Sequence, residues 1–390
     1  MSDDSSSLWI ATADDLDALC KRLRTAAWLA LDTEFMRERS YFPKLCLIQL
    51  ATPELVACVD PLAVTDLSPL LDVLYDTHIT KVLHAARQDL EILFNLAQRV
   101  PTPVFDTQLA ASFAGFPDQV GYATLVEQLT GVHLDKGHTR ADWSRRPLSE
   151  GAQRYAADDV RYLRDVYLKL HAELARRERL TWMERERATL EDPATYRNDP
   201  ELAWRRLRGA QRLKPRQLAA AKTLAAWREQ RAMDEDLPRQ WVLKDELLYD
   251  LARQQPASIE ALREMRGVND ALLRKYGEAW LTLLRDAPAA TPGAAPAARL
   301  DAEDEALVDA LSAVLRLKSA AGEVSAAQLA TRAEIEKLVR GERSLAVLSG
   351  WRLDAVGRDL LRLLDGEIAL VVRDHRLMLE PISKLSNRSC

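Results

Sequence analysis

A set of acidic residues has the types and positions that a metal site needs: Asp32, Glu34, Asp89 and Asp159. Their carboxylates are hard oxygen ligands with no histidine or cysteine among them, so the set suits Mg²⁺ or Mn²⁺ rather than zinc. Four such acids can hold two divalent ions about 4 Å apart, the arrangement that activates water and stabilises a leaving oxygen in phosphodiester cleavage. On this interpretation Asp32 bridges both ions. Glu34 and Asp159 complete the first set of ligands, and Asp89 supports the second.

The first two acids are expected on one face of a β-strand over residues 28–35. Successive side chains of a strand point to opposite faces, so Asp32 and Glu34 lie side by side. Like charges at that distance repel, and burial would raise their pKa values unless a cation lay between them. For this octet alone, a strand with a solvated polar face is the simpler explanation. The metal site therefore depends on partner acids elsewhere.

The partner acids are expected on the core-facing stripes of two helices. Asp89 belongs to a helix over residues 87–97, where an acid on the stripe is costly unless it is paired or bound to a metal. Favourable interaction with the helix dipole is an alternative explanation for Asp89. Asp159 lies mid-stripe in a helix over residues 150–174, beyond the first turn. Tyr155 lies four residues earlier on the same face and would orient the attacking hydroxide, because its phenol has too high a pKa to be the base.

The order of the expected elements predicts an α/β fold in the first half of the chain and helices in the second. Strands at 28–35, 45–51 and 55–60 have short connections, which indicate an antiparallel meander. Strands at 79–84 and 104–106 then alternate with helices, so we expect a mixed central sheet with helices on its faces. Beyond residue 150 no convincing strand is expected before the extreme C-terminus. Helices are expected at 13–26, 67–75, 87–97, 108–114, 122–129 and 150–174.

Composition predicts a soluble, intracellular protein. The chain has 390 residues, of which 47% are hydrophobic and 29% charged, so it can form the cores of two or three domains. Its four cysteines show no CxxC spacing, which argues against a zinc site or a disulfide framework and suits a reducing cytoplasm. The polar, acidic N-terminus does not resemble a signal peptide, and no apolar run approaches the roughly 18 residues that span a bilayer.

Net charge counts against a polyanionic partner, but the distribution of charge does not. The chain carries a net charge of −5. Between Glu201 and Glu229, however, there is no acid, and a solvated helix face or a path for a nucleic-acid backbone would explain the basic residues there equally well. These residues are Arg205, Arg206, Arg208, Arg212, Lys214, Arg216, Lys222 and Arg228.

Three motifs carry a family resemblance: LDTEF at 31–35, HAARQDL at 84–90 and YAADDV at 155–160. Together, in this order, they resemble the three exonuclease motifs of the DEDD superfamily. The tyrosine four residues before the last aspartate resembles the DEDDy branch. The resemblance implies a ribonuclease H-like fold and 3′→5′ hydrolysis that releases 5′-mononucleotides. All four acids and the tyrosine match the pattern, which implies an active enzyme.

Two further segments look like parts of the bacterial ribonuclease D family, at residues 40–50 and 136–148. The second has basic residues around Trp143, the residue types that pair with phosphates and stack on the bases of a single strand. A solvated loop with Trp143 buried as an anchor is at least as good an explanation for the tryptophan. RNA contacts are expected at Tyr41, Phe42, Gln49, His84, Lys136, Arg140, Trp143 and Arg146.

The helical half is expected to hold two modules separated by an Ala/Pro-rich linker. The first resembles an HRDC domain, a small helical bundle that helps helicases and nucleases bind nucleic acid, and the second resembles the first in pattern. No GxxxxGK[ST] phosphate loop occurs, which excludes an ATP-driven motor. The expected parts are a DEDDy exonuclease domain over 1–195, a basic helical connector over 196–212, an HRDC domain over 213–288, the linker over 289–299, an HRDC-like all-α bundle over 300–375 and a tail over 376–390.

The resemblance implies a metal-dependent 3′→5′ exoribonuclease that acts on structured RNAs with single-stranded 3′ ends, tRNA precursors above all. It would act as a cytoplasmic monomer with two Mg²⁺ or Mn²⁺ ions, without ATP or a membrane. A DNA exonuclease of the proofreading or repair type is an alternative, because the sequence does not locate a contact to the 2′-hydroxyl of RNA. A non-catalytic RNA-binding scaffold is a second alternative, against which the intact acids and Tyr155 argue.

Overall fold

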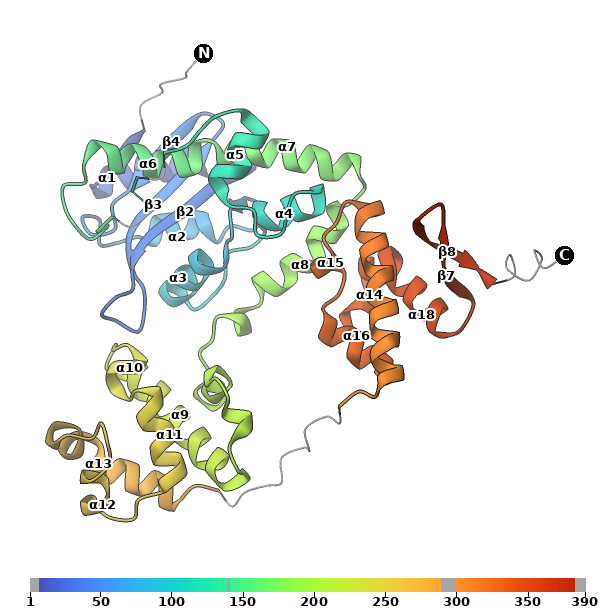
Figure 1. Ribbon diagram of the computed structural model, residues 1–390. Coiled ribbons are helices and arrows are strands. Elements are labelled where there is room, and N and C mark those ends of the chain that lie inside the picture. The colour runs from blue at the N-terminus through green and yellow to red at the C-terminus, as the bar shows by residue number, and fades with distance from the viewer. Residues whose placement is uncertain (1–6, 136, 139–140, 289–298, 383–390) are drawn as a thin grey trace. The chain divides into compact units, whose positions relative to one another are not determined.

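The computed structural model of the chain describes residues 7–135, 137–138, 141–288 and 299–382 (Figure 1). As far as these residues go, the chain forms two compact units. One takes in Met1–Glu34, Cys46–Thr195 and Arg299–Cys390. The other takes in Phe35–Leu45 and Tyr196–Ala298, so a short segment from the N-terminal half belongs with helices that follow much later in the sequence.

The first unit is built on a six-stranded sheet of β1 (Leu8–Ile10), β2 (Trp28–Met36), β3 (Lys44–Thr52), β4 (Leu55–Val59), β5 (Thr80–Leu83) and β6 (Val104–Asp106). The strand order is β1-β4-β3-β2-β5-β6. β1 pairs parallel with β4, β5 with β2 and β6 with β5, whereas β3 and β4 are antiparallel. The predicted mixed sheet is confirmed. β1 was not predicted, because three residues are too few to show a strand period.

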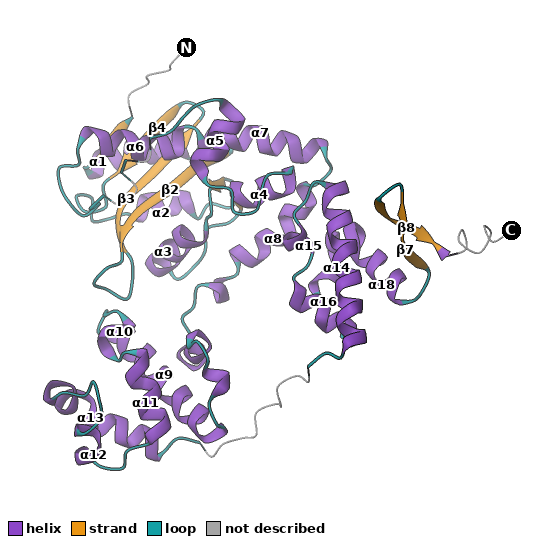
Figure 2. Ribbon diagram, viewed as in Figure 1, coloured by secondary structure: helices purple, strands orange, loops and turns teal. Residues whose placement is uncertain are grey.

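Helices flank this sheet (Figure 2). Their apolar stripes face it, and α6 packs on β4 while α7 packs on α4 and α5. They are α1 (Ala13–Leu23), α2 (Ser68–Leu74), α3 (Arg87–Ala97), α4 (Thr107–Ala114), α5 (Tyr122–Thr130), α6 (Glu150–Arg161), α7 (Leu163–Arg176) and α8 (Leu180–Glu191). The helices predicted up to residue 130 are confirmed within a few residues at their ends.

The helix predicted over 150–174 is divided into α6 and α7 at Tyr162. The Tyr122 hydroxyl donates to the Asp158 carbonyl at 3.0 Å, and the helical bond from the Tyr162 amide to that same carbonyl is stretched to 3.5 Å. A side chain that enters the helical hydrogen-bond ladder weakens the ladder locally, as the stretched bond at Tyr162 shows. The prediction of one continuous helix over 150–174 was therefore wrong at Tyr162, and no local sequence pattern marks the interruption.

The second unit is a helical bundle of α9 (Pro215–Asp234), α10 (Arg239–Val242), α11 (Asp245–Gln254), α12 (Ile259–Arg263) and α13 (Asp270–Arg285). Two 3₁₀ segments precede it, η2 (Pro200–Arg206) and η3 (Ala210–Arg212). Trp280 is completely buried in its core, together with leucines and alanines of α9 and α11. Tyr41 and Phe42, from the segment between β2 and β3, pack into the same core.

The C-terminal region packs within the first unit and contains α14 (Ala302–Gly322), α15 (Ala326–Leu329), α16 (Arg332–Val339), α17 (Gly350–Arg352), the π-helical η5 (Leu353–Gly357) and α18 (Arg358–Leu364). It ends in an antiparallel hairpin of β7 (Ile368–Arg373) and β8 (Arg376–Pro381). The expectation of an all-α bundle was therefore wrong for this region. Asp374 and His375 both have positive φ, 48° and 62°, as a two-residue hairpin turn requires.

Among the residues that the structure describes, no helix is both long enough and apolar enough to cross a membrane.

Candidate active site

Asp32, Glu34 and Asp159 come together in the first unit. One carboxylate oxygen of each lies within 4.8 Å of those of the other two, and all three residues are half-buried. Asp32 and Glu34 stand two residues apart on β2, so strand alternation places them on one face. Asp159 comes from α6, shortly before the interruption at Tyr162. The structure thus joins one strand and one helix at a cluster of acids.

Asp89 is tied to this cluster through Thr33. It lies in the first turn of α3 and is buried, and its Oδ1 accepts a hydrogen bond from the Thr33 hydroxyl at 2.5 Å. Thr33 stands between Asp32 and Glu34 on β2. Sequence reasoning missed Thr33, because the strand period assigned it to the apolar face. The signal that the sequence offered for Thr33 was its position as a hydroxyl residue between two acids.

Burial raises the pKa of all four acids, and for Asp32 and Glu34 the charges of other acids in the set add to the shift. For Asp32, burial followed by the charges of Asp89, Asp159 and Glu34 raises the pKa well above its usual range. Burial, followed by the charges of Asp159 and Asp89, raises the pKa of Glu34 to about 8. Burial and the charge of the preceding aspartate raise the pKa of Asp159 to about 8. Burial raises the pKa of Asp89 to about 7, although the hydroxyl that donates to it opposes the shift.

These acids fit a divalent-metal site by the chemistry of their donor atoms. Two oxygens bound to one Mg²⁺ at about 2.0–2.1 Å lie at most about 4.2 Å apart. The oxygens of Asp32, Glu34 and Asp159 lie within 4.8 Å of one another, so small side-chain movements bring them to that spacing. Their charged forms repel one another in a partly buried site, so positive charge or protons must accompany them. A hard divalent cation satisfies both conditions.

Asp106, at the end of β6, fixes the turn that leads into α3. Its carboxylate accepts from the amides of Ala85 at 3.1 Å and Ala86 at 2.9 Å, and it also caps α4 through the amides of Gln108 and Leu109. Ala85 has a φ of 56°, which is unfavourable for a residue with a Cβ and must be held by its surroundings. Sequence reasoning missed Asp106, although an acid just before a helix is a recognisable N-cap signal.

Tyr155 lies on α6, four residues before Asp159, and is half-buried. Its ring centroid is 6.1 Å from those of both His138 and Trp143. The predicted tyrosine therefore shares a helix face with a predicted metal ligand, among aromatic side chains from the preceding loop.

The loop before α6 is anchored by Arg146 and Trp143. The Arg146 guanidinium donates to Asp60 Oδ2 at 2.6 Å, to Asp60 Oδ1 at 2.8 Å and to the carbonyls of Cys46 and Trp143. Burial of Asp60 opposes its ionisation, but the bonds from Arg146 and from the backbone outweigh burial and lower the pKa of that carboxyl. Trp143 is 2% exposed. The alternative of a buried anchoring tryptophan is confirmed.

The remaining predicted RNA contacts lie in varied surroundings. Tyr41 is 2% exposed, and Gln49 is fully buried with no hydrogen bond to its amide within the described part of the chain. Phe42 is partly buried against the core of the second unit. The His84 ring is held between the Thr107 hydroxyl and the Val120 carbonyl, each at 3.0 Å. Lys136 and Arg140 lie outside the described residues.

Comparison with known proteins places this arrangement in a family. The 3′-5′ exonuclease family matches residues 8–175, and the HRDC domain family matches residues 217–284. Ribonuclease D of Acidiphilium cryptum is 45% identical over 377 residues, which cover 94% of this chain and 95% of that protein. Ribonuclease D of Granulibacter bethesdensis is 43% identical over 380 residues, 95% of each.

A solved structure agrees with these relatives. The crystal structure of Escherichia coli RNase D, an exoribonuclease involved in structured RNA processing, superposes with a TM-score of 0.80 at 36% identity. The match covers 93% of this chain and 99% of the Escherichia coli chain. By sequence and by fold, over nearly its whole length, the chain belongs to the ribonuclease D family.

Proposed function

We propose that the chain trims the 3′ ends of structured RNAs, tRNA precursors above all, and that it does so with two Mg²⁺ or Mn²⁺ ions. As a member of its family the chain is a 3′→5′ exoribonuclease, and exonucleases of this fold depend on divalent metal ions. The proposal adds the substrate, the number of ions and the residues in the reaction. The meeting of Asp32, Glu34 and Asp159 within 4.8 Å is the observation that carries it.

In this proposal Asp32, Glu34 and Asp159 would hold one ion, and Asp32 with Asp89 would hold the other. Bound divalent ions supply the positive charge that activates water and stabilises the leaving oxygen of a phosphodiester. The carboxylates must be deprotonated to act as ligands, so their raised pKa values make binding compete with protons. Thr33 holds Asp89 by a hydrogen bond, and this bond supports the orientation of the fourth acid.

Tyr155 would orient the attacking water. A phenol both donates and accepts hydrogen bonds, and its usual pKa near 10 keeps it protonated at neutral pH. Its place one helical turn before Asp159 directs it to the same face of α6 as that ligand. Tyr155 therefore has the chemistry to hold a water in line with the scissile bond, whereas it is poorly suited to remove a proton.

Exposed cations of the second unit support an RNA substrate larger than a dinucleotide. Lys222 lies over the Trp204 ring with its nitrogen 4.5 Å from the centroid, at the edge of a basic surface. Such surfaces follow a phosphate backbone without reading sequence. The exposed cations between η2 and α9 are Arg205, Arg206, Arg208, Arg212, Lys214, Arg216 and Lys222. The Escherichia coli relative, which is involved in structured RNA processing, supports structured RNAs as the substrate class.

The two alternatives to an exoribonuclease lose support. Relatives with the name ribonuclease D cover nearly the full chain, which favours RNA over DNA. All four acids and Tyr155 are present, which argues against a scaffold.

We also propose that the protein is a monomer and that it acts in the cytoplasm. Cys20 and Cys58 are buried free cysteines, as a reducing compartment allows.

Matched RNA and DNA substrates with labelled ends test the proposal. Each is incubated with Mg²⁺, with Mn²⁺ and with EDTA, and a tRNA precursor with a 3′ extension is compared with an unstructured RNA. We expect 5′-mononucleotides from the 3′ end of RNA only, no product in EDTA, and trimming of the precursor to a defined end. Equal cleavage of DNA, or activity in EDTA, would contradict the proposal.

A further inference from the structure

The hairpin between β2 and β3 leaves the catalytic sheet and belongs to the helical unit. The chain passes from Glu34 directly into Phe35–Leu45, which forms one compact unit with Tyr196–Ala298. Glu34, which with Asp32 lies on β2, is therefore joined by one peptide bond to a segment that the helical bundle holds.

The backbone of the hairpin is bound by Asp236. Its Oδ1 accepts from the amides of both Tyr41 and Phe42, each at 3.0 Å. Asp236 itself has a φ of 47° in the turn after α9, so its carboxylate is presented by a constrained backbone. The Ser40 hydroxyl donates to the Phe42 carbonyl at 2.6 Å and stiffens the hairpin. Two amides of the hairpin are therefore satisfied by one acid of the bundle.

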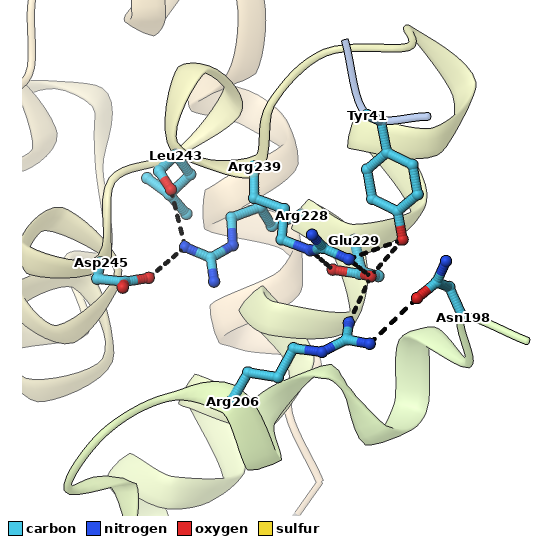
Figure 3. Close-up of polar contacts among 8 residues, drawn as sticks. All are labelled: Tyr41, Asn198, Arg206, Arg228, Glu229, Arg239, Leu243 and Asp245. Atoms are coloured by element: carbon cyan, nitrogen blue, oxygen red, sulfur yellow. Dashed lines mark hydrogen bonds and ion pairs between the residues drawn. The ribbon is translucent and has the colours of Figure 1, made fainter. Parts of the chain in front are cut away.

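The Tyr41 side chain enters the bundle and meets charge there (Figure 3). It is 2% exposed, and its hydroxyl donates to Glu229 Oε1 at 2.5 Å. The Arg239 guanidinium lies 4.5 Å from the centre of the Tyr41 ring, and its Nη2 donates to the Tyr41 oxygen at 2.9 Å. A buried phenol with two polar partners and a cation over its ring has one well-defined position.

Glu229 is the centre of this cluster. It is 1% exposed and accepts from Arg239 Nε and Nη2, both at 2.6 Å, and from Arg206 Nη1 at 2.8 Å. Burial opposes its ionisation, but the bonds from Arg239 and Tyr41 outweigh burial and lower the pKa of the carboxyl. Arg206 is held in turn by Asn198, at 3.1 Å. Glu229 is therefore a fixed, charged acceptor for the Tyr41 hydroxyl.

We propose that Tyr41, held by Glu229 and Asp236, is a positioning residue for Glu34. The HRDC domain thereby fixes the end of β2 and with it the geometry of the acid cluster. Glu34, Asp32 and Asp159 repel one another when charged, and the end of a strand is the part most easily displaced by repulsion. Metal ligands must be held to within about 0.5 Å of their working geometry. Tyr41 then acts on catalysis through position and does not contact RNA.

This inference depends on the proposed role of Glu34 as a metal ligand, so its test separates the two. The variant is Tyr41→Phe in the full chain, which keeps the ring and removes the hydroxyl. Glu229→Gln is a second, harsher variant, because it leaves Arg239 and Arg206 without their counter-charge. The matched control is Asp245→Asn. It weakens the ion pair of Arg228 Nη1 and Asp245 Oδ1, 2.6 Å apart in the same bundle, in which the Arg228 side chain is buried and the Asp245 side chain is partly exposed (Figure 3).

Amide hydrogen exchange in the absence of metal is measured first, because it needs neither metal binding nor activity. In Tyr41→Phe we expect exchange over residues 33–45 to be roughly tenfold faster, the size of change that follows from one hydrogen bond to a charged group. In Asp245→Asn exchange over the same residues should equal that of the wild type. Unchanged exchange over residues 33–45 in Tyr41→Phe would overturn the inference, whatever the wild type does with metal.

Mn²⁺ binding by calorimetry and steady-state kinetics on a short RNA complete the test. We expect Tyr41→Phe to bind Mn²⁺ about tenfold more weakly and to need more Mg²⁺ for half-maximal kcat, with KM for RNA unchanged. Equal weakening of Mn²⁺ binding in Asp245→Asn would indicate general destabilisation and overturn the inference. A raised KM for RNA with unchanged metal affinity would also overturn the inference, because a direct contact between Tyr41 and RNA predicts that result. A wild type that binds no Mn²⁺ would instead refute the proposed metal site.

Discussion

Single residues decide whether the acid cluster works, and Asp32 and Asp159 are the ones whose loss should stop hydrolysis. We predict that Asp32→Ala or Asp159→Ala lowers kcat about a thousandfold or more, since each removes a ligand from ions that supply several kcal/mol of transition-state stabilisation. The fold should survive, because each change also removes a charge that repels its neighbours. Single-turnover assays with circular dichroism check both points. Asp165→Ala, at an exposed acid on α7, is the control, and wild-type turnover in either variant would contradict the metal site.

The raised pKa values of the same residues predict how stability depends on pH without metal. The pKa is about 8 for Glu34, about 8 for Asp159 and about 7 for Asp89, against 4.5, 3.8 and 3.8 ordinarily. Between about pH 5 and 8 the native state holds more protons than the unfolded state, so stability falls as pH rises. In EDTA we expect the thermal midpoint to fall across this window, and Mg²⁺ to restore it at the upper end. A double variant, Glu34→Gln with Asp159→Asn, should lose most of the decline. If the thermal midpoint of that variant fell with pH as much as that of the wild type, other titratable groups would be the cause of the decline.

At the scale of elements, α3 depends on a single acid from the neighbouring strand. We predict that Asp106→Ala lowers the free energy of unfolding by about 2 kcal/mol or more, because the buried amide of Ala86 and the amide of Ala85 lose their acceptor. The kcat of this variant should fall by more than the lost free energy of unfolding explains, because α3 carries Asp89. Asp106→Asn is the intermediate variant: its amide oxygen can replace Oδ1 for Ala85 and for the α4 cap, but its NH2 cannot accept from the Ala86 amide. Urea unfolding and metal-saturated kcat are measured for both. We expect a smaller loss in Asp106→Asn than in Asp106→Ala, and unchanged stability in Asp106→Ala would contradict the prediction.

The elements also show where sequence reasoning succeeds and where it stops. Hydrophobic periodicity located β2 and α3 almost to the residue, because one face of each meets a core. At the interruption between α6 and α7 the Tyr122 hydroxyl from α5 donates to the Asp158 carbonyl, and a contact between distant segments leaves no local pattern. Strand alternation placed Asp32 and Glu34 together correctly. Tyr41 was predicted to contact RNA. Strand alternation could not show that its side chain instead enters a helical core and bonds to Glu229, which lies 188 residues later in the sequence.

At the scale of the whole molecule, the C-terminal region is a structural part of the first unit. Trp351 is 6% exposed and stacks on Trp182 of α8 with ring centroids 4.5 Å apart. Glu186 of α8 accepts from the Trp351 indole at 3.2 Å and from the Arg352 guanidinium at 2.5 Å. Apolar stacking and charged hydrogen bonds thus join α8, which follows the catalytic helices, to residues that come much later in the sequence. Removal of the region would expose the Trp182 ring and leave Glu186 without these partners.

This junction predicts that the catalytic domain and the C-terminal region unfold together. Trp351→Ala should lower the free energy of unfolding of the first unit by about 3–5 kcal/mol, the usual cost of truncating a buried aromatic side chain. Trp241→Ala is the control, because that tryptophan is 58% exposed in the other unit and its loss should change stability by less than about 0.5 kcal/mol. Hydrogen exchange in α6 and α8 at increasing urea reports on the catalytic domain directly. If Trp351→Ala sped exchange in residues 302–364 and left α6 and α8 unchanged, the two parts would fold independently, and the contacts at Glu186 would contribute little to the active site's support.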